Sequence, residues 1–118
     1  MAIETRTIVF NEIELVQAAY NYCVRVEMPL PNGRLNSVRA SAESIDRVLL
    51  RFAGDGAKET EIQLSYHQMA AALILHCGTT GIPLPRYARK RLAPAGEGMA
   101  LIIRMPEYAG EAFLADAG

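Results

Sequence analysis

Two spacings of apolar residues alternate along this chain. Apolar residues at every third to fourth position predict two helices, over 12–27 and 66–80. Apolar residues at every second position predict strands, and these cover 3–10, 48–52, 58–64 and 99–105. The predicted order is therefore strand, helix, strand, strand, helix, strand.

Both predicted helices begin with the same capping signal. Asn11 is followed three residues later by Glu14, and Ser65 is followed three residues later by Gln68. In such a pair, each side chain accepts a hydrogen bond from the other residue's backbone N–H, which satisfies donors that the first turn leaves unpaired. Pro29 ends the first helix, because proline cannot continue the helical hydrogen bonding. Local chemistry alone thus places the helix ends.

The chain also contains an internal repeat with an offset of 54 residues. A cysteine followed six residues later by Pro-Leu-Pro occurs once near the end of each predicted helix. The last strand of each copy aligns at an offset of 53, which matches 48–52 with 101–105. The other matches are 8–11 with 62–65, Leu15 with Met69, Ala18 with Ala72, Cys23 with Cys77, and 29–31 with 83–85.

Two tandem βαβ units predict a ferredoxin-like α+β fold of the order βαββαβ. Its four-stranded antiparallel sheet would have the strand order 4-1-3-2, with both helices on one face. In an alternative α+β packing, residues 35–43, expected as a short edge strand, form a full strand that pairs with 46–53. The predicted organisation is one domain over 1–105, repeats over about 3–53 and 57–105, and a flexible tail over 106–118.

Composition narrows the class of protein. The 118 residues carry a formal net charge of -1, whereas a nucleic-acid-binding domain is usually basic. Cys23 and Cys77 are the only cysteines and lie in apolar helical patterns, so we expect buried free thiols. No apolar run approaches the roughly 20 residues that cross a bilayer. With no secretory signal pattern at the N-terminus, we expect a cytoplasmic protein.

A single basic segment follows the second Pro-Leu-Pro, where the two repeats differ most. Its charges suit contacts with phosphate, so it is the candidate contact for an anion or for nucleic acid. A solvated basic loop is the simpler interpretation of the same charges. The candidate residues are Arg86, Arg89, Lys90 and Arg91.

The sheet face turned away from the helices is a second candidate surface, for a second copy of the chain or for another protein. The alternative is a solvated face with cross-strand ion pairs. Such pairs would join Arg47 and Arg51 to Glu59 and Glu61. The candidate interface residues are Val9, Leu49, Arg51, Ile102 and Arg104.

The sequence does not establish an activity. It contains no recognisable catalytic, metal-binding or nucleotide-binding motif, so it indicates neither an enzyme nor a cofactor. His76 and Cys77 are adjacent and diverge by about 100° on a helix, which prevents them from acting as base and nucleophile. The leading hypothesis is a small non-enzymatic protein-interaction module that forms a homodimer. The alternatives are a nucleic-acid-binding protein that uses 86–91 and a regulatory domain that binds a small ligand.

Overall fold

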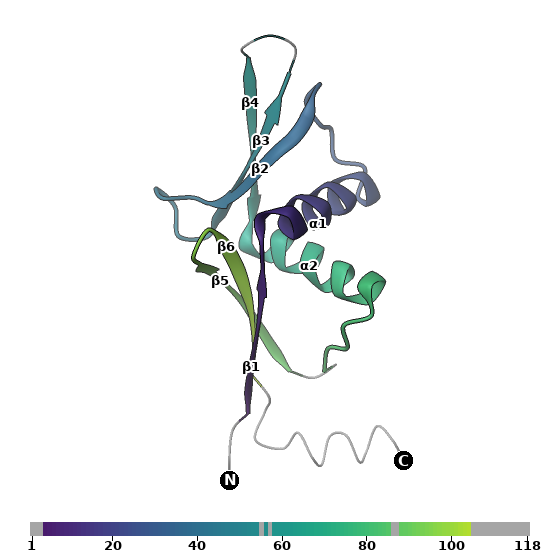
Figure 1. Cartoon of the computed structure of the whole chain (residues 1–118), viewed down its shortest axis with the longest axis vertical. Helices are drawn as coiled ribbons and strands as arrows, with labels where there is room; N and C mark the ends of the chain where they lie inside the picture. Colours follow the sequence, from purple (N-terminus) through teal and green to yellow (C-terminus); the bar gives the residue numbers. More distant parts are fainter. Residues whose placement is uncertain (1–3, 55, 57, 86–87, 105–118) are drawn as a thin grey trace.

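Two helices and six strands make up the described part of the chain, residues 4–54, 56, 58–85 and 88–104 of the computed structural model. The strands form two three-stranded antiparallel sheets, sheet A in the order β1-β6-β5 and sheet B in the order β2-β3-β4. Figure 1 shows the two sheets following one another along the long axis, with both helices beside them. The elements are β1 (Thr5–Phe10), α1 (Glu12–Arg25), β2 (Arg34–Ala40), β3 (Arg47–Ala53), β4 (Glu59–Ser65), α2 (Tyr66–Thr80), β5 (Arg89–Ala95) and β6 (Gly98–Arg104).

The predicted single four-stranded ferredoxin-like sheet is wrong. Two of its strand pairs exist, because β1 lies beside β6 and β3 lies beside β4. The pair that would have joined them, β1 with β4, is replaced by a division into two sheets. Each sheet gains a strand on its other side, since β5 flanks β6 and β2 flanks β3. Each central strand is therefore hydrogen-bonded on both sides within its own sheet.

The repeat unit is β-α-β-β rather than β-α-β. The first unit contributes β1, α1, β2 and β3, and the second contributes β4, α2, β5 and β6. The first strand of each unit pairs in the sheet of the other unit: β1 joins β6, and β4 joins β3. In Figure 1, purple β1 accordingly lies beside yellow-green β6. Neither unit completes a sheet without the other.

Of the two additional strands, β2 could be predicted from the sequence and β5 could not. The alternative expectation of a full strand over 35–43 paired with 46–53 is confirmed in its pairing, since β2 pairs with β3, but the strand ends at Ala40. The sequence predicts a basic loop where β5 lies. Basic residues and Pro94 hide the strand pattern there, because sheet edges tolerate proline and often carry Lys or Arg.

The last strands of the two repeats correspond at an offset of 51 residues, not 53. Phe10 is opposite Met99 in sheet A, and its repeat counterpart Leu64 is opposite Val48 in sheet B. Met99 therefore corresponds to Val48. Side chains alternate between the two faces of a strand, so an error of two residues leaves every apolar residue on the same face. The apolar pattern could not distinguish the two offsets.

The core lies between the helices and the inner faces of both sheets. Burying one large apolar side chain of this kind stabilises the fold by about 1.5–3 kcal/mol. Cys23 and Cys77 are buried and free, as expected. The largest side chains that are almost fully buried are Phe10, Leu15, Val38, Val48, Leu50, Phe52, Leu64, Met69, Leu73, Met99, Leu101 and Ile103.

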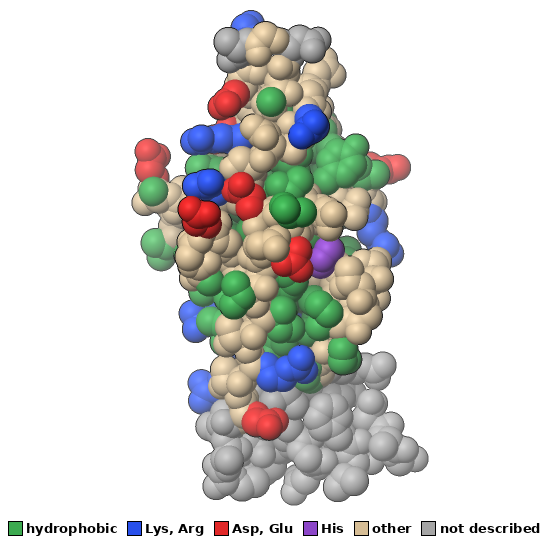
Figure 2. Space-filling view, in the orientation of Figure 1, with side chains coloured by type: hydrophobic (Ala, Val, Ile, Leu, Met, Phe, Trp, Pro, Cys, Tyr) green, Lys and Arg blue, Asp and Glu red, His purple; other side chains and the backbone are tan. Residues whose placement is uncertain are grey.

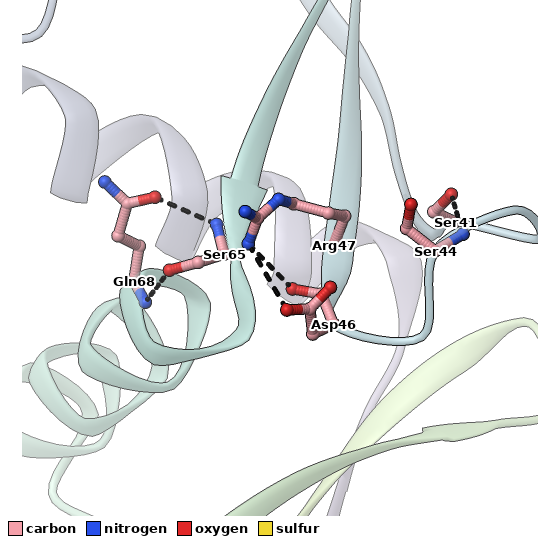
Figure 3. A network of polar contacts seen from close by, with 6 residues as sticks. All are labelled: Ser41, Ser44, Asp46, Arg47, Ser65 and Gln68. Carbon is pink, nitrogen blue, oxygen red and sulfur yellow. Dashed lines mark hydrogen bonds and ion pairs between the residues drawn. The ribbon is translucent and has the colours of Figure 1, made fainter.

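Both predicted capping boxes are present. The Asn11 carboxamide accepts a hydrogen bond from the Glu14 N–H at 2.9 Å, and the Glu14 carboxylate accepts one from the Asn11 N–H at 3.1 Å. Ser65 and Gln68 make the equivalent pair at 3.1 and 2.9 Å (Figure 3). Neither of the two described helices is long and apolar enough to span a bilayer. The tail expected over 106–118 lies outside the described residues.

Candidate functional site

Three arginines lie side by side on the face of sheet A that points away from the core. Arg104 on the central strand β6 is directly opposite Arg89 on the edge strand β5. Arg91 follows Arg89 by two residues and therefore shares its face, because strand side chains alternate. All three are exposed. Arg89, Arg91 and Arg104 are called the arginine cluster below.

The arginine cluster borders an open cleft of about 710 Å³. Thr5 of β1, which is opposite Arg104, and Ile102 of β6 complete its floor. Lys90 also borders the cleft, although its ammonium group donates a hydrogen bond to the Ala88 carbonyl at 3.2 Å. The cleft thus offers guanidinium donors, a hydroxyl group and an aliphatic surface.

The opposition of Arg89 and Arg104 is unfavourable in the absence of an anion. Like charges at facing strand positions destabilise a sheet. None of the arginine cluster forms an ion pair with another described residue. A carboxylate or phosphate would remove the repulsion, because each planar guanidinium can donate two parallel hydrogen bonds to it.

Protection of the sheet edge explains only part of the arginine cluster. Basic residues on an edge strand hinder its pairing with another chain, and this reason applies to Arg89 and Arg91 on β5. Arg104 lies on β6, which is paired on both sides and has no free edge. Edge protection therefore does not account for Arg104.

On the corresponding face of sheet B, Arg39 and Arg51 are paired with carboxylates. Arg51 donates to the Glu61 carboxylate at 3.1 Å, as the sequence predicts. Arg39 of β2 donates to Glu12 of α1, also at 3.1 Å. On the side of the molecule shown in Figure 2, basic and acidic side chains accordingly lie next to one another over the upper half, where sheet B lies. This face presents less unbalanced charge to an anion.

The predicted pairing of Arg47 with the opposite strand does not occur. Arg47 lies opposite Ser65, and its guanidinium is 3.6 Å from the carboxylate of the neighbouring Asp46 (Figure 3). Glu59 lies opposite Ala53 instead. In the observed register of β3 and β4, Arg47 and Glu59 therefore lie at opposite ends of the hairpin.

The structure brings together members of both predicted sites. Arg89 and Arg91 come from the predicted basic segment, whereas Ile102 and Arg104 come from the predicted sheet-face interface. Val9 lies on the same face of sheet A and is 61% exposed. The outer face of sheet A therefore combines charged residues of the predicted basic segment with apolar residues of the predicted sheet-face interface.

Other predicted residues lie elsewhere. Leu49 and Arg51 are on the outer face of sheet B, where they border a separate cleft with Arg39. The predicted interface is thus divided between two sheets. Arg86 lies outside the described residues.

The pairing of Arg104 with Arg89 was not predicted from the sequence. The signal is the two-residue turn Gly96-Glu97, in which Gly96 has a φ of 58° that favours glycine. A two-residue loop sets the register, so that Ala95 pairs with Gly98 and, six residues further, Arg89 pairs with Arg104. The turn could have been read as a hairpin if 89–95 had been recognised as a strand.

The cysteines offer little reactivity. Burial raises the pKa of the Cys23 thiol. Burial also raises the pKa of Cys77, and the negative charge of Glu14 adds to the effect. Thiols with raised pKa values are weak nucleophiles, because the thiolate is the reactive form. Within the described ranges, no group of three or more His, Cys, Asp or Glu residues is placed to hold a metal ion.

No protein-family model matches this chain, and no curated protein or solved structure is significantly similar to it. Its function is therefore inferred from its own residues and their geometry.

Proposed function

We propose that this protein is a non-enzymatic interaction module whose arginine cluster binds an acidic segment of a partner protein. The observation that carries the proposal is the grouping of Arg89, Arg91 and Arg104 on one face with no ion pair to a described carboxylate. A guanidinium stays protonated in proteins, so it can hold an anion but cannot act as a general base. The chemistry of the cluster therefore suits recognition.

A protein ligand fits the face better than a nucleic acid. Proteins that bind single-stranded nucleic acid on a sheet usually stack bases on aromatic side chains. The described side chains on this face are aliphatic, hydroxyl or basic, and they include Thr5, Thr7, Val9 and Ile102.

The spacing of the arginine cluster specifies the kind of segment. Arg89 and Arg91 are two residues apart on one strand, which places them about 7 Å apart. An extended peptide repeats its side chains at the same interval. Carboxylates at every second residue of a partner would therefore face successive arginines, and Arg104, about 5 Å across the sheet from Arg89, could contact the same carboxylate.

Fluorescence anisotropy with a labelled peptide of alternating Glu and Ser tests this proposal. We expect binding that weakens as salt is added, because screening reduces attraction between exposed charges. The triple variant Arg89→Gln, Arg91→Gln, Arg104→Gln should lose affinity by about tenfold or more, equivalent to about 1.4 kcal/mol. A peptide with Gln in place of Glu should not bind measurably.

Sheet B provides a matched control. The variant Arg39→Gln, Arg47→Gln, Arg51→Gln removes the same charge from the corresponding face and should change the affinity by less than about twofold, since all three arginines are already in ion pairs. Equal losses in both triple variants would show that net charge alone attracts the peptide. Tighter binding of oligo(dT) or oligo(U) than of the acidic peptide would replace the proposal with nucleic-acid binding.

A further inference from the structure

The residues that directly follow the arginine cluster in the chain carry the opposite charge. Arg104 is the last described residue, and residues 105–118 come after it. All twelve Lys and Arg residues lie in 1–104 together with ten of the thirteen acidic residues, so that part of the chain has a net charge of +2. Residues 105–118 have a net charge of -3, from Glu107, Glu111 and Asp116. An acidic segment is therefore attached directly to the basic cleft.

The outer face of sheet A presents its side chains in three rows that run across the strands. The row at the Arg104 end holds Thr5, Arg104 and Arg89. The second row holds Thr7, Ile102 and Arg91, and the third holds Val9, Ala100 and Ala93. Successive rows are about 7 Å apart, because side chains return to the same face at every second residue. The charge thus lies at the end where the chain leaves the sheet, and apolar surface lies further in.

Residues 105–118 carry these two kinds of side chain in the same order. Glu107 and Glu111 come first, and the apolar Phe113 comes after them. A segment that turns back over the sheet would bring Glu107 to the first row, Glu111 to the row of Arg91, and Phe113 to the row of Val9. Glu111 and Phe113 are two residues apart, which in an extended chain is the interval between those two rows. Such a contact would also cover Val9, which is 61% exposed.

The connection is long enough for these contacts. A chain spans at most about 3.3–3.6 Å per residue, so Glu107 can lie up to about 10 Å from Arg104 and Glu111 up to about 24 Å. Arg89 is only about 5 Å across the sheet from Arg104. A short tether also holds a ligand at an effective concentration in the millimolar range. Weak contacts between exposed charges are therefore sufficient to keep the segment at the cleft.

We infer that residues 105–118 fold back over the outer face of sheet A in the same chain and occupy the arginine cluster as an internal ligand. These residues lie outside the described part of the chain, so their charge, their order and their attachment at Arg104 carry the inference. The regulatory consequence rests on the proposed function, because the segment would compete with the acidic segment of a partner for the same guanidinium groups.

The spacing of the acidic residues explains how a partner displaces the segment. The carboxylates in 105–118 are four and five positions apart, whereas the arginines of β5 suit carboxylates at every second residue. The internal ligand therefore matches the cluster less well than an alternating acidic peptide and depends on its tether. A partner with the better spacing replaces it, and a weakly acidic surface does not.

Neutralising the segment in the full chain tests the competition. The variant Glu107→Gln, Glu111→Gln, Asp116→Asn should bind the labelled Glu-Ser peptide about fivefold more tightly than the wild type. This factor corresponds to a segment that covers the cleft for about four-fifths of the time, because only the uncovered fraction binds the peptide. Removing the same charge from exposed residues that form no described ion pair is the matched control and should change the affinity by less than about twofold, in the variant Glu43→Gln, Glu59→Gln, Glu97→Gln.

A measurement without peptide detects the contact itself. A nitroxide attached to the variant Ala112→Cys should broaden the NMR signals of the Val9 methyl groups, and the broadening should disappear when the three acidic residues are neutralised. The nitroxide reagent selects the new cysteine because Cys23 and Cys77 are buried. In a mixture where one chain carries the nitroxide and another carries the isotopes, no broadening is expected, because the contact lies within one chain.

The two measurements separate this inference from the proposed function. Broadened Val9 signals without peptide binding in any variant would support the internal contact and refute the acidic partner. Unchanged Val9 signals, or equal peptide affinities in the wild type and the neutralised variant, would overturn the inference while the acidic partner could still stand. An equal gain in the matched control would also overturn it, since net charge would then be the cause. So would broadening in the mixture, because the segment would then occupy a second copy.

Discussion

The outer faces of the two sheets occupy equivalent places in the repeat but carry opposite arrangements of charge. In sheet B, Arg51 on the central strand faces Glu61 and pairs with it. The equivalent positions in sheet A hold Ile102 and Thr7, which have no charge to pair. In sheet A the charge lies instead on the arginine cluster. The outer face of sheet B thus carries arginines that are paired with glutamates. The arginine cluster of sheet A has no ion pair with a described residue.

The inner faces and helix starts show no such divergence. Phe10 and Leu64 are fully buried at equivalent positions, and so are Leu50 and Leu101. Both helices begin at a complete capping box. At these positions the two halves are alike, and the contrast in charge lies on their outer faces. The residues that the two halves share are therefore assigned to the scaffold, and the arginine cluster, which only one half has, is the candidate functional site.

The largest expected effect tests whether the two halves are equal as scaffold. Leu50→Ala and Leu101→Ala each remove a fully buried side chain from the centre of a sheet. Each should lower the free energy of unfolding by about 2–5 kcal/mol, measured by urea denaturation. Because β1 and β4 each pair in the other half's sheet, both variants should still unfold in one transition. Two separated transitions would show that the halves fold independently.

Loss of either helix cap should have a smaller and equal effect. Asn11→Ala and Ser65→Ala each remove a side chain that accepts a hydrogen bond from the first turn. Each should cost about 1 kcal/mol of stability. Thermal and urea unfolding of the two variants side by side measure this. A loss in only one variant would mean that one cap is dispensable and that the scaffolds differ.

Introducing a carboxylate on the outer face of sheet A should give that face an ion pair like those of sheet B. Thr5 is opposite Arg104 in sheet A, and its counterpart in sheet B is Glu59, opposite Ala53. Thr5→Glu should stabilise the fold by about 0.2–1 kcal/mol through a cross-strand ion pair. The same change should weaken binding of the acidic peptide, because the new carboxylate competes for Arg104. Glu59→Thr is the control and should leave peptide affinity unchanged.

The smallest expected effect concerns the buried thiols. The pKa values of Cys23 and Cys77 are raised above the ordinary 9.0, so the folded chain keeps these protons at a pH where the unfolded chain loses them. The stability associated with them is complete below pH 9.0 and declines as the pH rises through the raised values. Iodoacetamide should therefore modify both thiols more slowly in the folded chain than in urea. Rapid alkylation of folded Cys77 would contradict its assignment to the scaffold.

Local features of the sequence predicted most of the elements. The capping boxes at Asn11 and Ser65, and the apolar stripe around Leu15 and Met69, depend only on neighbouring residues. The buried strand faces follow from alternation, which is also local. β5 was the exception, since an edge strand can be basic and contain Pro94 without losing its hydrogen bonds to β6.

The candidate site was harder to predict from the sequence than the helices and strands were. Arg89 and Arg91 stand out in the sequence as basic residues, but Arg104 is fifteen positions from Arg89 and joins them only through the hairpin register. The exposed side of α2 could not be recognised in the sequence for a different reason. An apolar helix predicts burial, and only the packed chain reveals that Ile74 and Gly78 are left exposed.

The internal repeat could be recognised in the sequence because residue types recur at a fixed offset. Both helices with their caps and the apolar faces of the central strands could be predicted because they depend on residues that are near neighbours in the chain. The folded chain was needed to show that β1 and β4 each pair in the sheet of the other repeat, and that the last strands correspond at an offset of 51. Hydrogen bonds between strands join backbone groups that are alike at every residue, and side chains repeat every two residues. The pattern of residue types therefore says which face is buried, while only the assembled chain selects the partner and the register that bring Arg89 and Arg104 together.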